Sequence, residues 1–241
     1  MRLVLLALLL GCSQTPTPRS ASVEETIWYE RPLPLVVDAI ALPSGETLRY
    51  GRIVPDECEQ PGACPVLIAL PGGAQNENLM EESLRPWAQS LHDHQWIVLS
   101  PIADDALFFE GGERLLPPFL DRMAERYLTS DGRFLLFGVS NGGLSAFRIA
   151  TLEPERFRGV VVAPGFARTD DQARLRALRE TPVVLFVGER DRWLQPTEVT
   201  YRSLREAGVP TTLRILPNRG HNLATLPWAD LHAALLGEND D

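Results

Sequence analysis

Short apolar runs alternate with amphipathic stretches along most of the chain. Several apolar runs are continuous in Val, Ile and Leu, which is typical of strands in a parallel sheet covered on both faces. The predicted strands are residues 47–54, 64–73, 96–103, 133–140, 157–165, 182–189 and 211–218. The stretches between them have helical periodicity, and the predicted helices are residues 77–91, 114–128, 143–153, 196–207 and 225–236.

This alternation predicts one α/β domain, residues 27–241, with a doubly wound, mostly parallel sheet and helices on both faces. The pattern contains no internal repeat and indicates no second domain. Residues 166–181, between two of the predicted strands, are too few for a large inserted lid domain.

The N-terminal residues follow a different pattern. The apolar run Leu3–Leu10 follows the basic Arg2, is too short to cross a bilayer, and is typical of a secretory signal. Its ending, LLGC, resembles a bacterial lipobox, in which the cysteine is lipidated. A simple signal peptide cleaved nearby is the alternative.

On the lipobox interpretation, residues 1–11 are the signal peptide and Cys12 carries the lipid. Residues 12–26 are rich in Ser, Thr and Pro and are predicted to be a flexible tether. The protein is then expected to be exported and held at the bacterial cell envelope by its acyl chains.

The other two cysteines, Cys58 and Cys64, flank a Pro-Gly turn signal. In an exported protein such neighbours are expected to form a disulfide, worth about 2 kcal/mol for so small a loop. Two free thiols are the alternative, and neither has a partner at zinc-ligand spacing.

Charge and composition narrow the classes of function. The formal net charge is −9 and the pI about 5.0, which argues against binding to nucleic acids. The sequence contains no lysine, so every basic residue is an arginine. That excludes a Ser-Lys dyad, a Schiff-base lysine and a P-loop lysine.

The stretch GVSNGG, residues 138–143, lies between a predicted strand and a predicted helix. A G-x-S-x-G sequence in this context is typical of a nucleophile elbow, a tight turn that exposes the serine hydroxyl above the sheet. Gly138 and Gly142 are expected because side chains there would collide with the neighbouring strand and helix. Ser140 is therefore the candidate nucleophile.

A nucleophilic serine needs a histidine base and an acid that orients the base. Asp191 follows the predicted strand 182–189, and His221 follows the strand 211–218, both at the sheet edge where ligands bind in open α/β sheets. Glu189 is the competing acid, but it lies nearer the strand, so Asp191 is preferred. His232, the other histidine after the serine, falls inside a predicted helix.

An oxyanion hole needs two backbone N–H groups. One is expected from Asn141, directly after the serine, and the other from the loop after the strand 64–73. Glycines let that backbone approach a substrate closely. Gly73 is the preferred donor and Ala74 the next.

Together these motifs resemble the α/β-hydrolase superfamily, from about Thr47 to Leu236. The resemblance rests on LRYGRIVP, the strand and loop LIALPGG, GVSNGG, GERDRW and RGHN. It is strongest for the small lidless branch: carboxylesterases and phospholipases, dienelactone-hydrolase-like enzymes, and feruloyl-esterase and polyhydroxybutyrate-depolymerase-like enzymes. Many relatives have His-Gly where this chain has Pro71-Gly72, so a side chain that usually ties the loop down is missing.

Three aromatic residues are candidates for a substrate pocket. Phe108 and Phe109 follow a predicted strand and Trp193 lies beside Asp191. Core packing is the alternative for them. His92 and His94 form an H-x-H pair without a clear third ligand, so no metal site is predicted.

The triad and the resemblance imply a serine esterase that forms an acyl-enzyme with a small-molecule ester and needs no cofactor. The same triad serves peptidases, thioesterases and acyltransferases. A surface lipoprotein that kept the fold as an inactive binding module is a further alternative.

Overall fold

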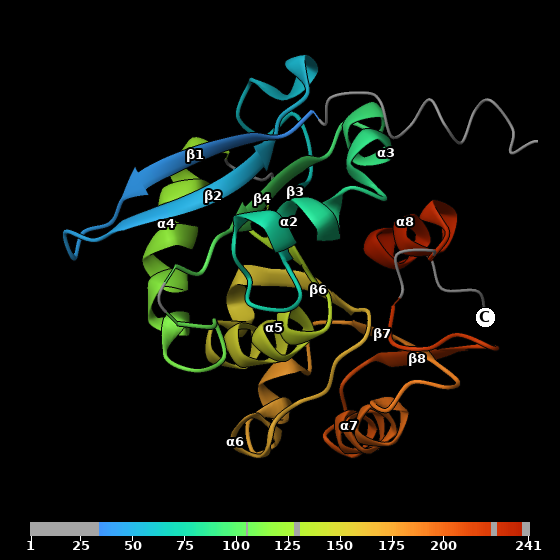
Figure 1. The fold of residues 1–241 in the computed structure, drawn as a ribbon. Coiled ribbons are helices and arrows are strands. Elements are labelled where there is room, and N and C mark those ends of the chain that lie inside the picture. Colours follow the sequence, from blue (N-terminus) through green and yellow to red (C-terminus); the bar gives the residue numbers. More distant parts are fainter. Residues whose placement is uncertain (1–33, 105, 128–130, 223–225, 238–241) are drawn as a thin grey trace, which may run out of the picture. The chain divides into compact units, whose positions relative to one another are not determined.

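The computed structural model describes residues 34–104, 106–127, 131–222 and 226–237. They form an eight-stranded sheet with the order β1-β2-β4-β3-β5-β6-β7-β8 (Figure 1). The strands are β1 (Val36–Ala41), β2 (Thr47–Ile53), β3 (Val66–Leu70), β4 (Ile97–Pro101), β5 (Phe134–Gly138), β6 (Phe157–Val162), β7 (Val183–Gly188) and β8 (Thr211–Leu216). β2 pairs antiparallel with β1 and with β4, and all the other neighbours pair in parallel. The expected mostly parallel sheet is confirmed.

Helices cover the sheet on both faces. They are α2 (Glu77–Leu84), α3 (Ala88–Asp93), α4 (Leu116–Arg126), α5 (Asn141–Leu152), the single turn α6 (Thr169–Gln172), α7 (Leu194–Glu206) and α8 (Trp228–Leu236). Short 3₁₀ segments are η1 (Asp56–Cys58), η2 (Gly112–Leu115), η3 (Pro154–Arg156) and η4 (Leu175–Leu178).

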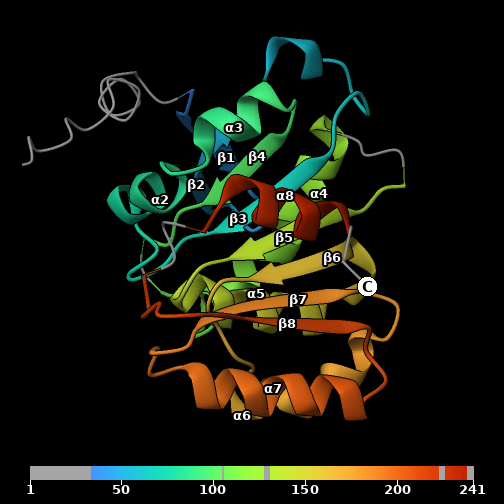
Figure 2. The same ribbon diagram turned by 90° about the vertical axis from the view of Figure 1, so that its right-hand side faces the viewer.

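Alternate residues of the central strands enter two separate apolar cores. In β3, Val66, Ile68 and Leu70 pack in the core that includes side chains of α4, α5 and α7. Leu67 and Ala69 pack in the core on the other face, with side chains of α2, α3 and α8. Figure 2 shows the arrangement of these helices around the sheet. Because every residue of β3 is buried, its sequence is a continuous apolar run with no polar alternation.

Two elements differ from the sequence-based expectation. The strand β1 was not predicted, although all of its residues except Asp38 are apolar; it is an edge strand whose residues are exposed or only partly buried. The predicted helix 77–91 is interrupted between Leu84 and Ala88, where Pro86 lies. A proline cannot donate the helical N–H bond, and it disfavours the helical conformation of the residue before it.

The connection between β2 and β3 carries a disulfide between Cys58 and Cys64, which is the predicted pairing. Both cysteines are buried in the core. The predicted signal peptide, Cys12, the tether and the start of the domain at residue 27 lie outside the described residues. Within the described part of the chain, no helix has the length and apolar character needed to cross a membrane.

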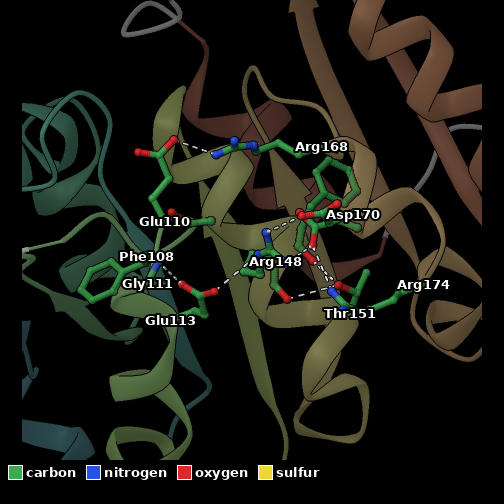
Figure 3. Close-up of polar contacts among 12 residues, drawn as sticks. Phe108, Glu110, Gly111, Glu113, Arg148, Thr151, Arg168, Asp170 and Arg174 are labelled. Atoms are coloured by element: carbon green, nitrogen blue, oxygen red, sulfur yellow. Dashed lines mark hydrogen bonds and ion pairs between the residues drawn. The ribbon is translucent and has the colours of Figure 1, made fainter.

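A cluster of charged side chains anchors α5, the helix that follows the GVSNGG turn (Figure 3). Arg148 of α5 is nearly buried, and its Nη1 lies 3.0 Å from Oδ1 of the fully buried Asp171 of α6. Glu113 of η2 lies 3.8 Å from Arg148 Nε, and Asp170 lies 4.0 Å from Nη2. One guanidinium therefore joins α5 to two other segments.

Asp171 is the most constrained member of this cluster. Burial raises the pKa of its carboxyl above the ordinary value, and the guanidinium groups of Arg148 and Arg174 oppose that rise. Because the folded-state pKa exceeds the unfolded one, folding favours the protonated form. The stability linked to Asp171 is therefore greatest below its unfolded pKa and falls as the pH rises through the folded-state pKa.

Replacing Arg148 by methionine tests this anchor. Arg148→Met leaves the buried carboxylate of Asp171 without its nearest cation, so the free energy of unfolding at pH 7 should fall by about 3 kcal/mol. The deficit should be smaller at pH 5 than at pH 7, because burial raises the pKa of Asp171 and loss of the cation favours the protonated carboxyl further. Urea unfolding at both pH values measures it.

The double variant Arg148→Met/Asp171→Leu is the matched control. It removes both charges, so it should recover most of the lost stability. If the double variant is as unstable as Arg148→Met at both pH values, the loss comes from packing around Arg148 and not from an unpaired carboxylate.

Candidate active site

The turn between β5 and α5 presents Ser140 at the carboxyl edge of the sheet. Ser140 has φ 54° and ψ −119°, a strained conformation for a residue with a side chain. A side chain at Gly142 would overlap the carbonyl oxygen of Leu70, and one at Gly138 would overlap that of Gly142. Glycine is required at both positions because the turn, β3 and α5 are in direct backbone contact.

Hydrogen bonds from neighbouring strand ends hold this turn. The N–H of Val139 donates to the Leu70 carbonyl at 3.1 Å, and the N–H of Ser140 donates to the Pro164 carbonyl at 2.9 Å. Leu70 is the last residue of β3 and Pro164 lies just after β6, and these are the two strands that flank β5. The position of Ser140 is therefore fixed by three strands.

The structure brings Ser140, His221 and Asp191 together. Ser140 Oγ lies 2.8 Å from His221 Nε2. His221 Nδ1 lies 3.0 Å from Asp191 Oδ1 and 3.1 Å from Oδ2. A carboxylate can only accept, so Nδ1 carries the proton and Nε2 is left to accept the serine hydroxyl hydrogen.

The two candidate acids occupy different environments. The Asp191 side chain is fully buried, and its Oδ1 also accepts a hydrogen bond of 2.8 Å from the Trp193 N–H. Glu189 is exposed and accepts from the N–H of Asn218 at 2.8 Å, within the turn after β8. The geometry favours Asp191 as the partner of His221. Glu189 instead stabilises the loop that leads to His221.

The loop after β3 lies directly against the serine. A Cβ placed on Gly72 would be 3.4 Å from Ser140 Cβ. Gly73 has φ +56°, and its carbonyl accepts a hydrogen bond of 2.9 Å from Asn141 Nδ2. Asn141 is the first residue of α5, where backbone N–H groups lack intrahelical acceptors and the helix dipole favours an anion. The two predicted oxyanion donors thus lie on adjoining segments beside Ser140.

Gln75 also belongs to this loop and is not among the site residues predicted from the sequence. Its side chain donates to the Pro71 carbonyl, so the loop is tied down although position 71 is a proline. The sequence signal for it is weak: one amide side chain in a glycine-containing loop.

The three aromatic residues predicted to line a pocket lie in different environments. Phe108 is fully buried in the core, so core packing and not pocket lining describes it. Phe109 is also buried, with the Arg168 guanidinium 5.1 Å from its ring centre. Trp193 is only partly buried, and its ring packs edge-on against His221 at 4.7 Å between centroids. Phe166, which was not predicted, packs edge-on against Trp193 at 5.1 Å.

A surface cavity of about 620 Å³ begins beside this aromatic pair. Phe166 forms part of its wall. The other residues that line it are Ala167, Arg168, Thr169, Gln172, Gln195, Pro196 and Val199. Two ring contacts, from Phe166 to Trp193 and from Trp193 to His221, connect the cavity wall to the imidazole.

The other histidines lie away from this site. His94 and His232 pack with each other and with Trp228, His232 being stacked on Trp228 at 4.8 Å. Among the described residues, no group of three or more His, Cys, Asp or Glu side chains is placed so that it could hold a metal ion.

No protein-family model matches the chain, and no curated protein matches its sequence. Solved structures do match its backbone. A thermostable esterase aligns with 83% of this chain at 16% identity and a TM-score of 0.63. The fluorophosphonate-binding serine hydrolase F of Staphylococcus aureus aligns with 86% at 14% identity and 0.67, and dipeptidyl peptidase 4 of Porphyromonas gingivalis with 91% at 12% identity and 0.66.

The matches differ in length. This chain spans 57% of the thermostable esterase and 37% of the peptidase, but 98% of the staphylococcal hydrolase. At such low identities the likeness concerns the course of the backbone. With the strand order and the turn at Ser140, it shows that this chain has the α/β-hydrolase fold.

Proposed function

We propose that this protein is a serine hydrolase that cleaves a carboxylic ester through an acyl-enzyme intermediate. The observation that carries the proposal is the continuous hydrogen-bonded series from Ser140 Oγ through His221 to the buried Asp191. This geometry matches the roles of nucleophile, general base and orienting acid. The esterase and serine hydrolase among the structures of the same fold support this reaction class.

The reaction then follows from the positions of the groups. His221 Nε2 takes the hydroxyl proton as Ser140 Oγ attacks the ester carbonyl. The N–H groups of Gly73 and Asn141 stabilise the resulting oxyanion. The alcohol leaves with the proton from His221, and water, activated by the same imidazole, releases the acid from Ser140. Asp191 fixes the imidazole tautomer and stabilises the imidazolium.

The ester is proposed as the substrate, although peptidases and thioesterases use the same chemistry. Trp193 and Phe166 provide an apolar surface that continues from His221 to the cavity between α6 and α7. In this proposal, the part of the substrate remote from the ester bond lies along these two rings.

We also propose that the protein acts outside the cytoplasm, held at the cell envelope by a lipid on Cys12. The LLGC ending of the N-terminal apolar run supports this. The disulfide between Cys58 and Cys64 supports an oxidising compartment.

Ser140→Ala tests the nucleophile. Because the turn is held by backbone contacts, the variant should fold, but hydrolysis of a short-chain nitrophenyl ester should fall by about 10⁴-fold or more. Labelling by a fluorophosphonate probe should also be lost. If Ser140→Ala keeps most of its activity, the mechanism is contradicted. If the unaltered protein cleaves a peptide anilide faster than the ester, it is a peptidase.

Asp191→Ala and Glu189→Ala form a matched pair, since both remove a carboxylate from the segment that follows β7. Loss of Asp191 leaves the imidazole without its partner, so kcat should fall by about 10³-fold to 10⁴-fold. Loss of Glu189 removes only the brace on Asn218 and should have a much smaller effect. Steady-state kinetics measure both, and the reverse order of effects would make Glu189 the orienting acid.

Cys12→Ser tests the anchor. Without the lipid, the short apolar run Leu3–Leu10 cannot hold the protein in a bilayer, so it should move from the membrane to the soluble fraction after cell lysis. Mass spectrometry of the unaltered protein should show an acylated N-terminal cysteine. An unmodified N-terminus, or membrane association that survives Cys12→Ser, refutes lipidation.

A further inference from the structure

Gln75 is a fully buried polar residue at the end of the loop that lies against Ser140. Its backbone has φ 58°, in the left-handed region that glycine and asparagine usually occupy. Glutamine has no intrinsic preference for this conformation, and an amide is costly to bury unless it is hydrogen-bonded. Other interactions must therefore hold Gln75 in place.

The side chain supplies those interactions. Nε2 donates to the Pro71 carbonyl at 3.2 Å and to Ser145 Oγ at 2.9 Å, and Oε1 accepts from the Phe108 N–H at 2.9 Å. Both amide donors and the carbonyl acceptor are thus in use. One side chain joins its own loop, the helix α5 and the segment that contains Phe108.

The backbone of Gln75 orients the peptide group between Gly72 and Gly73. The N–H of Gln75 donates to the Gly72 carbonyl at 3.0 Å, and its carbonyl accepts from the Ala103 N–H at 2.9 Å. In a planar trans peptide the C=O and the following N–H point in opposite directions. Because the Gly72 carbonyl points at Gln75, the Gly73 N–H points out of the turn.

We propose that Gln75 is a positioning residue whose buried amide holds this turn so that the Gly73 N–H faces the oxyanion formed at Ser140. This inference rests on the proposed function. Without the amide contacts, the left-handed backbone of Gln75 relaxes and the peptide between Gly72 and Gly73 turns. The donor is then lost while Ser140, His221 and Asp191 stay in place.

Gln75→Met separates hydrogen bonding from packing, because methionine has similar length and volume but no amide. Loss of one oxyanion donor lowers kcat by about 10²-fold to 10³-fold in serine hydrolases. A displaced donor should cost about 10-fold to 100-fold in kcat toward a nitrophenyl ester. KM should stay nearly unchanged, because the donor acts mainly in the transition state.

A trifluoromethyl ketone with the same acyl group provides the discriminating readout. Ser140 Oγ bonds to its carbonyl carbon, the serine proton passes to His221, and the carbonyl π electrons become the negative charge on oxygen. This adduct requires the oxyanion donors, so its inhibition constant should rise by the same factor as kcat falls. Active-site titration with a fluorophosphonate corrects for any inactive protein.

Thr181→Val is the matched control. Thr181 is buried, and its Oγ1 donates to the Phe157 carbonyl at 3.3 Å, at the amino end of β6 and so at the sheet edge opposite Ser140. Its loss should lower stability without changing kcat or the inhibition constant. Ser145→Ala removes one of the partners of Gln75, together with the hydrogen bond of 3.2 Å from Ser145 Oγ to the Asn141 carbonyl. It should shift both quantities in the same direction as Gln75→Met but by less.

The positioning role is overturned if Gln75→Met has an unchanged kcat per active site. It is also overturned if kcat falls while the inhibition constant of the trifluoromethyl ketone stays the same. If Gln75→Met does not fold, kcat and the inhibition constant of the trifluoromethyl ketone are measured on Ser145→Ala instead. No change in kcat, or a fall in kcat alone, again overturns the positioning role. Failure of the proposed function is distinct: in that case Ser140→Ala itself remains active.

Discussion

The parallel pairing of β3, β5, β6, β7 and β8 is the constraint on which the site depends. Parallel strands have their carboxyl ends at one edge, so the segments that follow them meet there. Ser140 follows β5, Asp191 follows β7 and His221 follows β8. None of these residues is near another in the sequence, and the register of the sheet brings them within hydrogen-bonding distance.

The sequence predicted the elements whose pattern reflects burial on both faces. β3, β4, β5 and β7 consist entirely of buried residues, and each was visible as an apolar run. β1 was not predicted, although its sequence is apolar except at Asp38; it lies at an edge of the sheet, where Val36 is 52% exposed. The break before Ala88 was missed because the apolar periodicity continues across Pro86 although the backbone does not.

The same distinction holds in the candidate site. Ser140, Asp191 and His221 could be found because each has a chemical requirement and a fixed place after a strand. Gln75 and Phe166 could not, because their importance comes from contacts with segments distant in the sequence: Gln75 with Ser145 and Phe108, and Phe166 with Trp193. A single sequence records which side chains exist but not which segments meet.

The backbone contacts at the serine turn also bear on how the protein acquires its structure. The turn takes its hydrogen-bond acceptors from Leu70 and Pro164, and Gly142 fits only against the end of β3. A strained turn whose supports are so far apart in the chain cannot be stable until β3, β5 and β6 have paired. The formed nucleophile therefore requires all three strands to have paired, and a chain in which they have not paired lacks it.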